Sequence, residues 1–167
     1  MSIFRTWISP KLRHCKYYVY SLKFFKGIFV FRRIMRTQAR ETLFKIIFAS
    51  QFCEQEEGFY RAMYKADKLD ANDEEYCNGI LKIAKEHGSE ISEIIDKHSR
   101  IFPESRLFPA DRSVLIIALS EILFSEGVPA PVSVNEAANI ASKYSSEKSA
   151  SFVSGIASEI IRERGNV

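Results

Sequence analysis

The sequence predicts an all-α protein of about seven helices in two small bundles. Apolar residues recur at helical spacing almost throughout the chain after Met35, and runs with the two-residue alternation of β-strands are absent. The composition, with 46% hydrophobic and 27% charged residues in 167, is that of a globular protein with one substantial core. Twelve Gly and Pro residues in total exclude collagen-like and linker-like classes.

The charge is divided unevenly along the chain. Residues 1–34 carry eight Lys and Arg, no acid and nine of the 21 aromatic residues, which leaves 16 basic against 21 acidic residues in 35–167. We interpret 1–34 as a basic, aromatic extension: translated upstream sequence with the true start at Met35, an organelle-type targeting segment, or an arm for RNA or an anionic membrane. Residues 35–167 are expected to form one domain, with subdomains at about 35–100 and 109–167.

The first predicted helix, 36–53, is apolar on two faces. One face carries Ala39, Leu43, Ile46 and Ile47. The opposite face carries Phe44, Phe48 and Phe52, flanked by Arg40 and Lys45. Such a helix is either buried between neighbours or presents its aromatic residues to a partner.

Three shorter helices are expected next, at about 58–68, 73–87 and 89–100. Gly88 stops the second of these, and Ser89 is placed to cap the third. His98 falls on the apolar face of the third helix, so we expect a core or boundary histidine rather than a catalytic base.

The second half begins after a linker at 101–108. Pro109 suits the first turn of a helix running to about 126, and the unbroken apolar run 114–119 makes it the central buried helix. A capping-box pattern from Ser133 to Glu136 predicts the start of the next helix, and Ser146 is placed to cap the last one. Gly155 costs that last helix about 1 kcal/mol against Ala, which we attribute to close approach of another helix.

No catalytic or metal-binding pattern stands out. The three cysteines and three histidines have no metal-ligand spacing, and phosphate-binding glycine loops and nucleophile motifs are absent. No uncharged apolar stretch is long enough for a membrane span. We therefore expect a cytoplasmic binding module without cofactor or metal, rather than an enzyme.

Four motifs in order resemble a known family. They are Ala39-Arg40-Glu41, residues 111–124 followed by Val128-Pro129, Val134-Asn135-Glu136-Ala137 with Ala141 and Lys143, and residues 152–156. Their spacing is similar to that of the NusB family of bacterial transcription antitermination factors, over about residues 36–164. The resemblance implies an all-helical, non-enzymatic protein that pairs with NusE, a protein of the small ribosomal subunit. The pair binds the boxA element of ribosomal RNA leader transcripts and loads a complex onto RNA polymerase that suppresses termination.

The resemblance also implies which residues act. The RNA-binding set is Arg36, Arg40, Lys45, Phe48, Lys148 and Phe152, and the NusE surface includes Asp111 and Arg112. The family's arginine cluster is thinned here, and Arg32 and Arg33 would restore it if the extension is translated. Lys148 stands where the family usually has an acid, so we expect it to strengthen RNA binding.

Other interpretations remain open at this point. The chain could be the helical domain of a ribosomal RNA methyltransferase, although 167 residues leave no room for a catalytic domain. It could also be a helical scaffold or a self-associating homologue, such as a homodimer, without RNA function. A hydrolase is the third alternative, and no residue pattern supports it.

Overall fold

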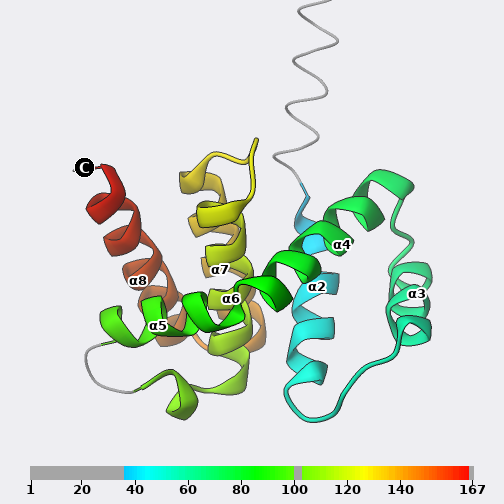
Figure 1. Ribbon diagram of the computed structural model, residues 1–167, viewed down its shortest axis with the longest axis horizontal. Coiled ribbons are helices and arrows are strands. Elements are labelled where there is room, and N and C mark those ends of the chain that lie inside the picture. The colour runs from blue at the N-terminus through cyan, green and yellow to red at the C-terminus, as the bar shows by residue number, and fades with distance from the viewer. Residues whose placement is uncertain (1–35, 100–102, 166–167) are drawn as a thin grey trace, which may run out of the picture. The chain divides into compact units, whose positions relative to one another are not determined.

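The computed structural model describes residues 36–99 and 103–165, which fold into seven α-helices and one 3-10 turn with no strand among them (Figure 1). The elements are α2 (Thr37–Ser50), α3 (Glu57–Ala66), α4 (Ala71–Glu86), α5 (Gly88–His98), η2 (Glu104–Arg106), α6 (Pro109–Phe124), α7 (Ala130–Tyr144) and α8 (Glu147–Gly165). The all-α prediction is confirmed. The predicted extension 1–34, with Arg32 and Arg33, lies outside the described residues.

Helix α6 is the centre of this bundle. It packs against α2 and α4 from the first half of the chain, and against α5, α7 and α8 as well. Val114, Leu115 and Leu119 are fully buried, as the unbroken apolar run predicted. Pro109 occupies the first turn, as expected, since a proline there loses no helical hydrogen bond.

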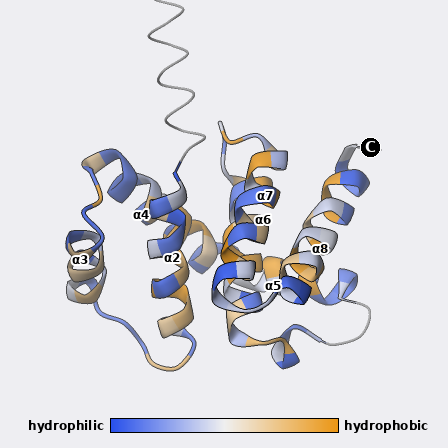
Figure 2. Ribbon diagram, turned by 180° about the vertical axis from the view of Figure 1, so that it is seen from behind, coloured by the Kyte–Doolittle hydropathy of each residue, from blue (hydrophilic) through white to orange (hydrophobic). Residues whose placement is uncertain are grey.

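Hydrophobic residues concentrate where α6 meets its neighbours (Figure 2). Leu43 and Ile46 of α2 are fully buried, which confirms the apolar face predicted for this helix, and Ile91 and Ile95 of α5 are fully buried as well. Helix α3 contributes only one buried residue, Tyr64, and is largely hydrophilic in Figure 2. One core is shared by both halves of the chain, and the boundary between two subdomains stays a prediction.

The predicted start of α7 was wrong. The helix begins at Ala130, three residues before the Ser133 capping box, with Pro131 in its first turn. Proline fits there because the first-turn N–H groups have no helical partner. Ser133 is consequently a buried residue inside the helix.

The starts of α4 and α5 differ from the prediction, and the start of α8 agrees with it. Helix α5 starts at Gly88 without a side-chain cap, so Ser89 does not cap it. Helix α4 starts earlier than predicted because the Asp70 carboxylate accepts a hydrogen bond from the Asp73 N–H (3.0 Å). The cap predicted for α8 is confirmed, since the Ser149 N–H donates to Ser146 Oγ (3.1 Å).

The expectation for Gly155 was also wrong. This glycine is exposed, and a Cβ placed there would meet no atom within 4 Å. No helix of the described chain approaches it, so the residue carries the conformational cost of glycine without a packing reason. Gly127 is different, because its φ of 89° lies in the left-handed region that favours glycine.

The two glycines should therefore respond oppositely to alanine. We expect Gly155→Ala to stabilise the protein by up to about 1 kcal/mol, since it lowers the entropy of the unfolded chain without a clash. Gly127→Ala should destabilise it by about 1 kcal/mol. Urea unfolding of both variants, followed by circular dichroism, measures the difference, and equal shifts in the two would contradict this interpretation.

Candidate RNA and partner interface

A buried ion pair joins α2 to α6. Arg40 Nε donates to Glu121 Oε1 at 2.9 Å, and both side chains are only 1% exposed. The Tyr76 hydroxyl of α4 donates to the same carboxylate. Glu136 of α7 lies 3.7 Å from the Arg40 guanidinium, which also faces the Tyr76 ring at 5.8 Å. Four helices therefore converge on one arginine.

The electrostatics of this network keep Arg40 charged and Tyr76 neutral. Burial alone would lower the pKa of Arg40, but the carboxylates of Glu121 and Glu136 raise it above its ordinary value. Burial, and then the Glu121 carboxylate, raise the pKa of Tyr76 well above its ordinary value, so this tyrosine stays a hydrogen-bond donor. Arg40, predicted to contact RNA, does not reach the surface in this structure.

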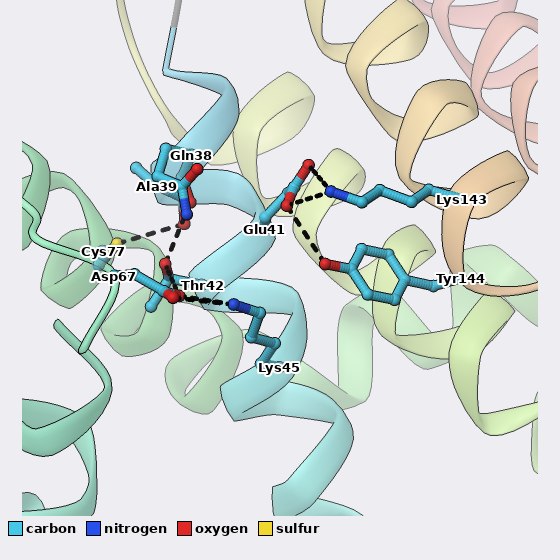
Figure 3. A network of polar contacts seen from close by, with 9 residues as sticks. All are labelled: Gln38, Ala39, Glu41, Thr42, Lys45, Asp67, Cys77, Lys143 and Tyr144. Atoms are coloured by element: carbon cyan, nitrogen blue, oxygen red, sulfur yellow. Dashed lines mark hydrogen bonds and ion pairs between the residues drawn. The ribbon is translucent and has the colours of Figure 1, made fainter.

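Arg36, directly before α2, and Lys45 within it were also predicted to bind RNA, and both have acidic partners. Arg36 lies over the Tyr76 ring at 4.6 Å and 3.7 Å from Asp73. Lys45 Nζ donates to Asp67 at 2.8 Å, and the Thr42 hydroxyl donates to the same carboxylate at 2.7 Å (Figure 3). Burial would raise the pKa of Asp67, but the hydrogen bonds from Lys45 and Thr42 lower it overall.

The opposite side of α2 is tied to the end of α7 (Figure 3). Lys143 Nζ donates to both Glu41 oxygens at 2.8 Å, and the Tyr144 hydroxyl donates to Glu41 at 3.2 Å. The hydrogen bond to Glu41 raises the pKa of Lys143. These contacts fix α2 from both flanks, so its aromatic face is held in one orientation.

That face forms an aromatic ladder of four rings, Tyr144, Phe44, Phe48 and Phe52. The successive ring centroids lie 4.6, 5.8 and 5.2 Å apart. Phe44 is buried and Phe48 is half-buried, while the two end rings are exposed, Tyr144 by 37% and Phe52 by 66%, so the ladder crosses the edge of the core between two exposed ends. Phe48 therefore sits at the boundary between core and solvent, where part of its ring is available for stacking.

A second feature, the α6–α8 groove, lies where α6 and α8 begin. It is a surface groove of about 340 Å³ lined by Arg106, Leu107, Phe108, Asp111, Lys148, Ser149 and Phe152. Three predicted site residues, Asp111, Lys148 and Phe152, therefore meet in one place. Sequence reasoning missed Phe108, which is 75% exposed. An apolar residue ahead of a helix-starting proline gave no signal that would separate it from core packing.

Arg112 and His98 have structural partners. Arg112 Nε donates to Glu104, which is itself buried, so the side chain fastens α6 to the preceding turn. His98 is buried, as expected, with Nδ1 2.7 Å from the Ile94 carbonyl and Nε2 3.2 Å from Glu163. Hydrogen bonds from Lys97 and His98 lower the pKa of Glu163.

Membrane-spanning helices and metal-binding clusters are both absent from the described residues. No helix in 36–99 or 103–165 is long and apolar enough to cross a membrane. In the same ranges, His, Cys, Asp and Glu side chains do not gather in groups of three that could hold a metal ion. The features that stand out are instead an aromatic ladder and an aromatic groove with a lysine beside it.

Comparison with known proteins assigns the fold to a family. The model of the NusB family matches residues 33–162. The chain belongs to the NusB family. The predicted resemblance, which rested on four short motifs, is thereby confirmed.

Individual NusB relatives agree with this assignment. The transcription antitermination protein NusB of Elusimicrobium minutum is 38% identical over 108 residues, covering 64% of this chain and 76% of the relative. The NusB of Natranaerobius thermophilus is 31% identical over 132 residues, covering 77% and 95%. Both relatives carry the same name.

Solved NusB structures share the fold. A crystal form of T. maritima NusB superposes with a TM-score of 0.68 at 30% identity, covering 77% of this chain and 91% of the other. A structure of the antitermination factors NusB and NusE in complex with double-stranded RNA gives a TM-score of 0.69 at 24% identity, covering 77% and 96%. At 24% identity, the similarity to the NusB–NusE complex is evidence for the fold alone.

The buried ion pair of this NusB-family bundle gives a stability prediction. Glu121→Leu should cost about 3–5 kcal/mol, because it leaves the buried Arg40 charge without its closest carboxylate. Adding Arg40→Met should recover part of that loss, since the unpaired charge is then removed. Urea unfolding of both single variants and the double variant gives the coupling.

The exposed Lys82–Glu86 pair on α4 provides the control (3.8 Å). Lys82→Ala should change the free energy of unfolding by less than about 1 kcal/mol, as expected for a solvated pair. A similarly small effect of Glu121→Leu would show that the Arg40–Glu121 contact does not hold α2 on α6.

Proposed function

We propose that this NusB-family chain is a transcription antitermination factor. With NusE it binds the boxA element of ribosomal RNA leader transcripts and promotes processive transcription by RNA polymerase. The observation that carries the proposal is the family match over residues 33–162, together with relatives named as antitermination proteins. The chain acts as a cytoplasmic binding module in this proposal and catalyses no reaction.

The RNA surface we propose lies on the aromatic ladder and the α6–α8 groove. Phe48 offers a half-buried ring, and Phe152 and the exposed Lys148 line the groove. Bases stack on aromatic rings, and lysine neutralises phosphate. Arg36 and Lys45 belong to this surface only if RNA competes with their acidic partners, and Arg40 is left out because it is buried.

The two halves of this surface are close neighbours. Gln51, next to Phe52 at the end of α2, donates through Nε2 to the Pro109 carbonyl at 2.8 Å. Pro109 directly follows Phe108 of the groove. The end of the ladder and the start of α6 are thus held together, so one RNA strand can contact both.

A partner is needed for tight binding in this proposal. Residues 35–167 have a net charge of −5, and three cations of α2 are already paired with acids. Affinity for nucleic acid depends on the number of phosphates neutralised. We therefore propose that NusE binds beside the groove at the start of α6, where Asp111, at the edge of the groove, and Arg112 form part of its surface.

Binding of a fluorescent boxA RNA to the full-length chain tests the function. We expect selective binding over a scrambled RNA, much tighter with NusE present, and weaker at higher salt. Fluorescence anisotropy at two salt concentrations measures all three effects. Equal affinity for both RNAs in the presence of NusE would favour a scaffold or a homo-oligomer without RNA function.

A charge reversal tests the groove within the same assay. Lys148→Asp should weaken boxA binding roughly 3- to 10-fold at low salt and make the salt dependence shallower, because one phosphate contact is lost. Lys82→Asp, an equal charge change on an exposed residue of α4 outside the groove, is the matched control and should have little effect. Unchanged affinity of the Lys148→Asp variant would remove Lys148 from the RNA surface.

A further inference from the structure

An aspartate at the end of α3 occupies the ammonium group of Lys45. Lys45 Nζ lies 3.0 Å from Asp67 Oδ1 and 2.8 Å from Oδ2, and the Thr42 hydroxyl donates to Oδ2 at 2.7 Å (Figure 3). The side chains of Lys45 and Asp67 are 32% and 16% exposed, so the pair is sheltered but still in contact with solvent. Both oxygens of the carboxylate are therefore bonded to α2.

The turn that carries Asp67 has a defined backbone. Asp67 is the C-cap residue of α3, and Lys68 follows with a φ of 54°, in the left-handed region. The Leu69 N–H donates to the Tyr64 carbonyl at 3.0 Å and the Lys68 N–H to the Lys65 carbonyl at 3.2 Å, which is the Schellman pattern of a helix end. A lysine in this conformation is strained, and the surrounding contacts must offset that cost. The carboxylate is therefore presented to α2 by a fixed turn.

Arg36 is held in a similar way directly before α2. Its Nε lies 3.7 Å from Asp73 Oδ1, and its guanidinium lies over the Tyr76 ring at 4.6 Å. Asp73 belongs to the first turn of α4, and Tyr76 is anchored because its hydroxyl donates to the buried Glu121. A separation of 3.7 Å is longer than a hydrogen bond, so the Arg36–Asp73 pair is weaker than the Lys45–Asp67 pair.

An RNA phosphate reaches either cation only by replacing an aspartate. Lys45 lies three residues before Phe48 on α2, and residues at that spacing are neighbours on a helix surface. A strand that stacks on Phe48 therefore brings its phosphates within reach of Lys45. Such a contact gives up the pair with Asp67 and leaves a partly buried carboxylate beside a phosphate, and the two negative charges repel. The aspartates thus compete with RNA.

We propose that Asp67 and Asp73 form an autoinhibitory contact, in which they occupy Lys45 and Arg36 and keep both cations from RNA phosphates. This inference rests on the proposed RNA-binding function and adds a means of regulating it. Phosphate contacts carry no sequence information, so the two pairs act on every RNA alike. They lower the affinity of the chain for all RNA and leave its selectivity unchanged. A chain restrained in this way depends on a protein partner for tight binding.

Removing one carboxylate tests the restraint. The amide oxygen of Asp67→Asn can still accept from Thr42, so circular dichroism and urea unfolding should show a folded protein. A fluorescein-labelled scrambled RNA, titrated with the full-length chain without NusE, should bind roughly 3- to 10-fold more tightly to this variant at low salt. The plot of log affinity against log salt should steepen by about 0.7, the slope for one further phosphate on a single strand. Asp73→Asn should give a smaller gain, because the Tyr76 ring still holds Arg36.

Two controls separate the release of Lys45 from a change in overall charge. Glu86→Gln removes the acid of the exposed Lys82–Glu86 pair on α4 (3.8 Å) with the same change in charge, and it should alter RNA affinity less than about 2-fold. The second control is a double-mutant cycle. Lys45→Gln should weaken binding more in the Asp67→Asn background than in the wild type, because only there is the lysine released. Every variant carries the same basic residues 1–34, so their contribution cancels.

The outcomes separate this inference from the function on which it rests. With NusE present, the preference for boxA over scrambled RNA should be the same for the wild type and Asp67→Asn. Equal gains from Asp67→Asn and Glu86→Gln, an equal effect of Lys45→Gln in both backgrounds, or a changed preference for boxA overturns the autoinhibitory contact and leaves the function standing. Absence of RNA binding by the wild type and by Asp67→Asn, with and without NusE, overturns both.

Discussion

The buried Arg40–Glu121 ion pair is the contact on which the architecture depends. It joins α2 to α6 at 2.9 Å, and Tyr76 and Glu136 bring α4 and α7 to the same guanidinium. Burying two charges is costly, so the pair is favourable only while the surrounding helices supply the remaining contacts. The same network fixes the rotation of α2. With α2 fixed, Phe44 faces Tyr144 and Phe52 faces solvent.

This arrangement explains how a domain of net negative charge can offer a surface to RNA. Arg40, which the family resemblance assigns to RNA binding, is buried in an ion pair. Arg36 and Lys45 are also paired with acids. The end of the bundle carries aromatic surface, and the exposed residues Lys148 and Arg106 lie beside it. In the proposed function, stacking would contribute more to RNA recognition than charge, and NusE would supply additional surface.

The sequence was sufficient to predict helices and core, because burial imprints a period of 3.6 residues on apolar positions such as Leu43 and Ile46. It could not predict that Arg40 and Ser133 are buried. The sequence around a polar residue in a helix does not show whether its side chain faces solvent or a buried partner from a distant segment. The expectation for Gly155 failed for a related reason. The cost of a glycine in a helix can be judged from the local sequence, but whether another helix packs against it depends on the tertiary structure. The groove escaped prediction because Phe108 and Phe152 are 44 residues apart, and only packing shows that they share a wall.

Hydrogen–deuterium exchange of the full-length chain bound to NusE, with and without boxA RNA, tests the central claim most directly. The claim is that RNA occupies the end of the bundle where α2 ends and α6 and α8 begin. RNA should slow exchange in residues 104–113 and 146–154 and at the end of α2, and leave α3 and α4 unchanged. Protection confined to α3 and α4, with none at the start of α6 and α8, would place the RNA on the opposite side of α2 and contradict this account.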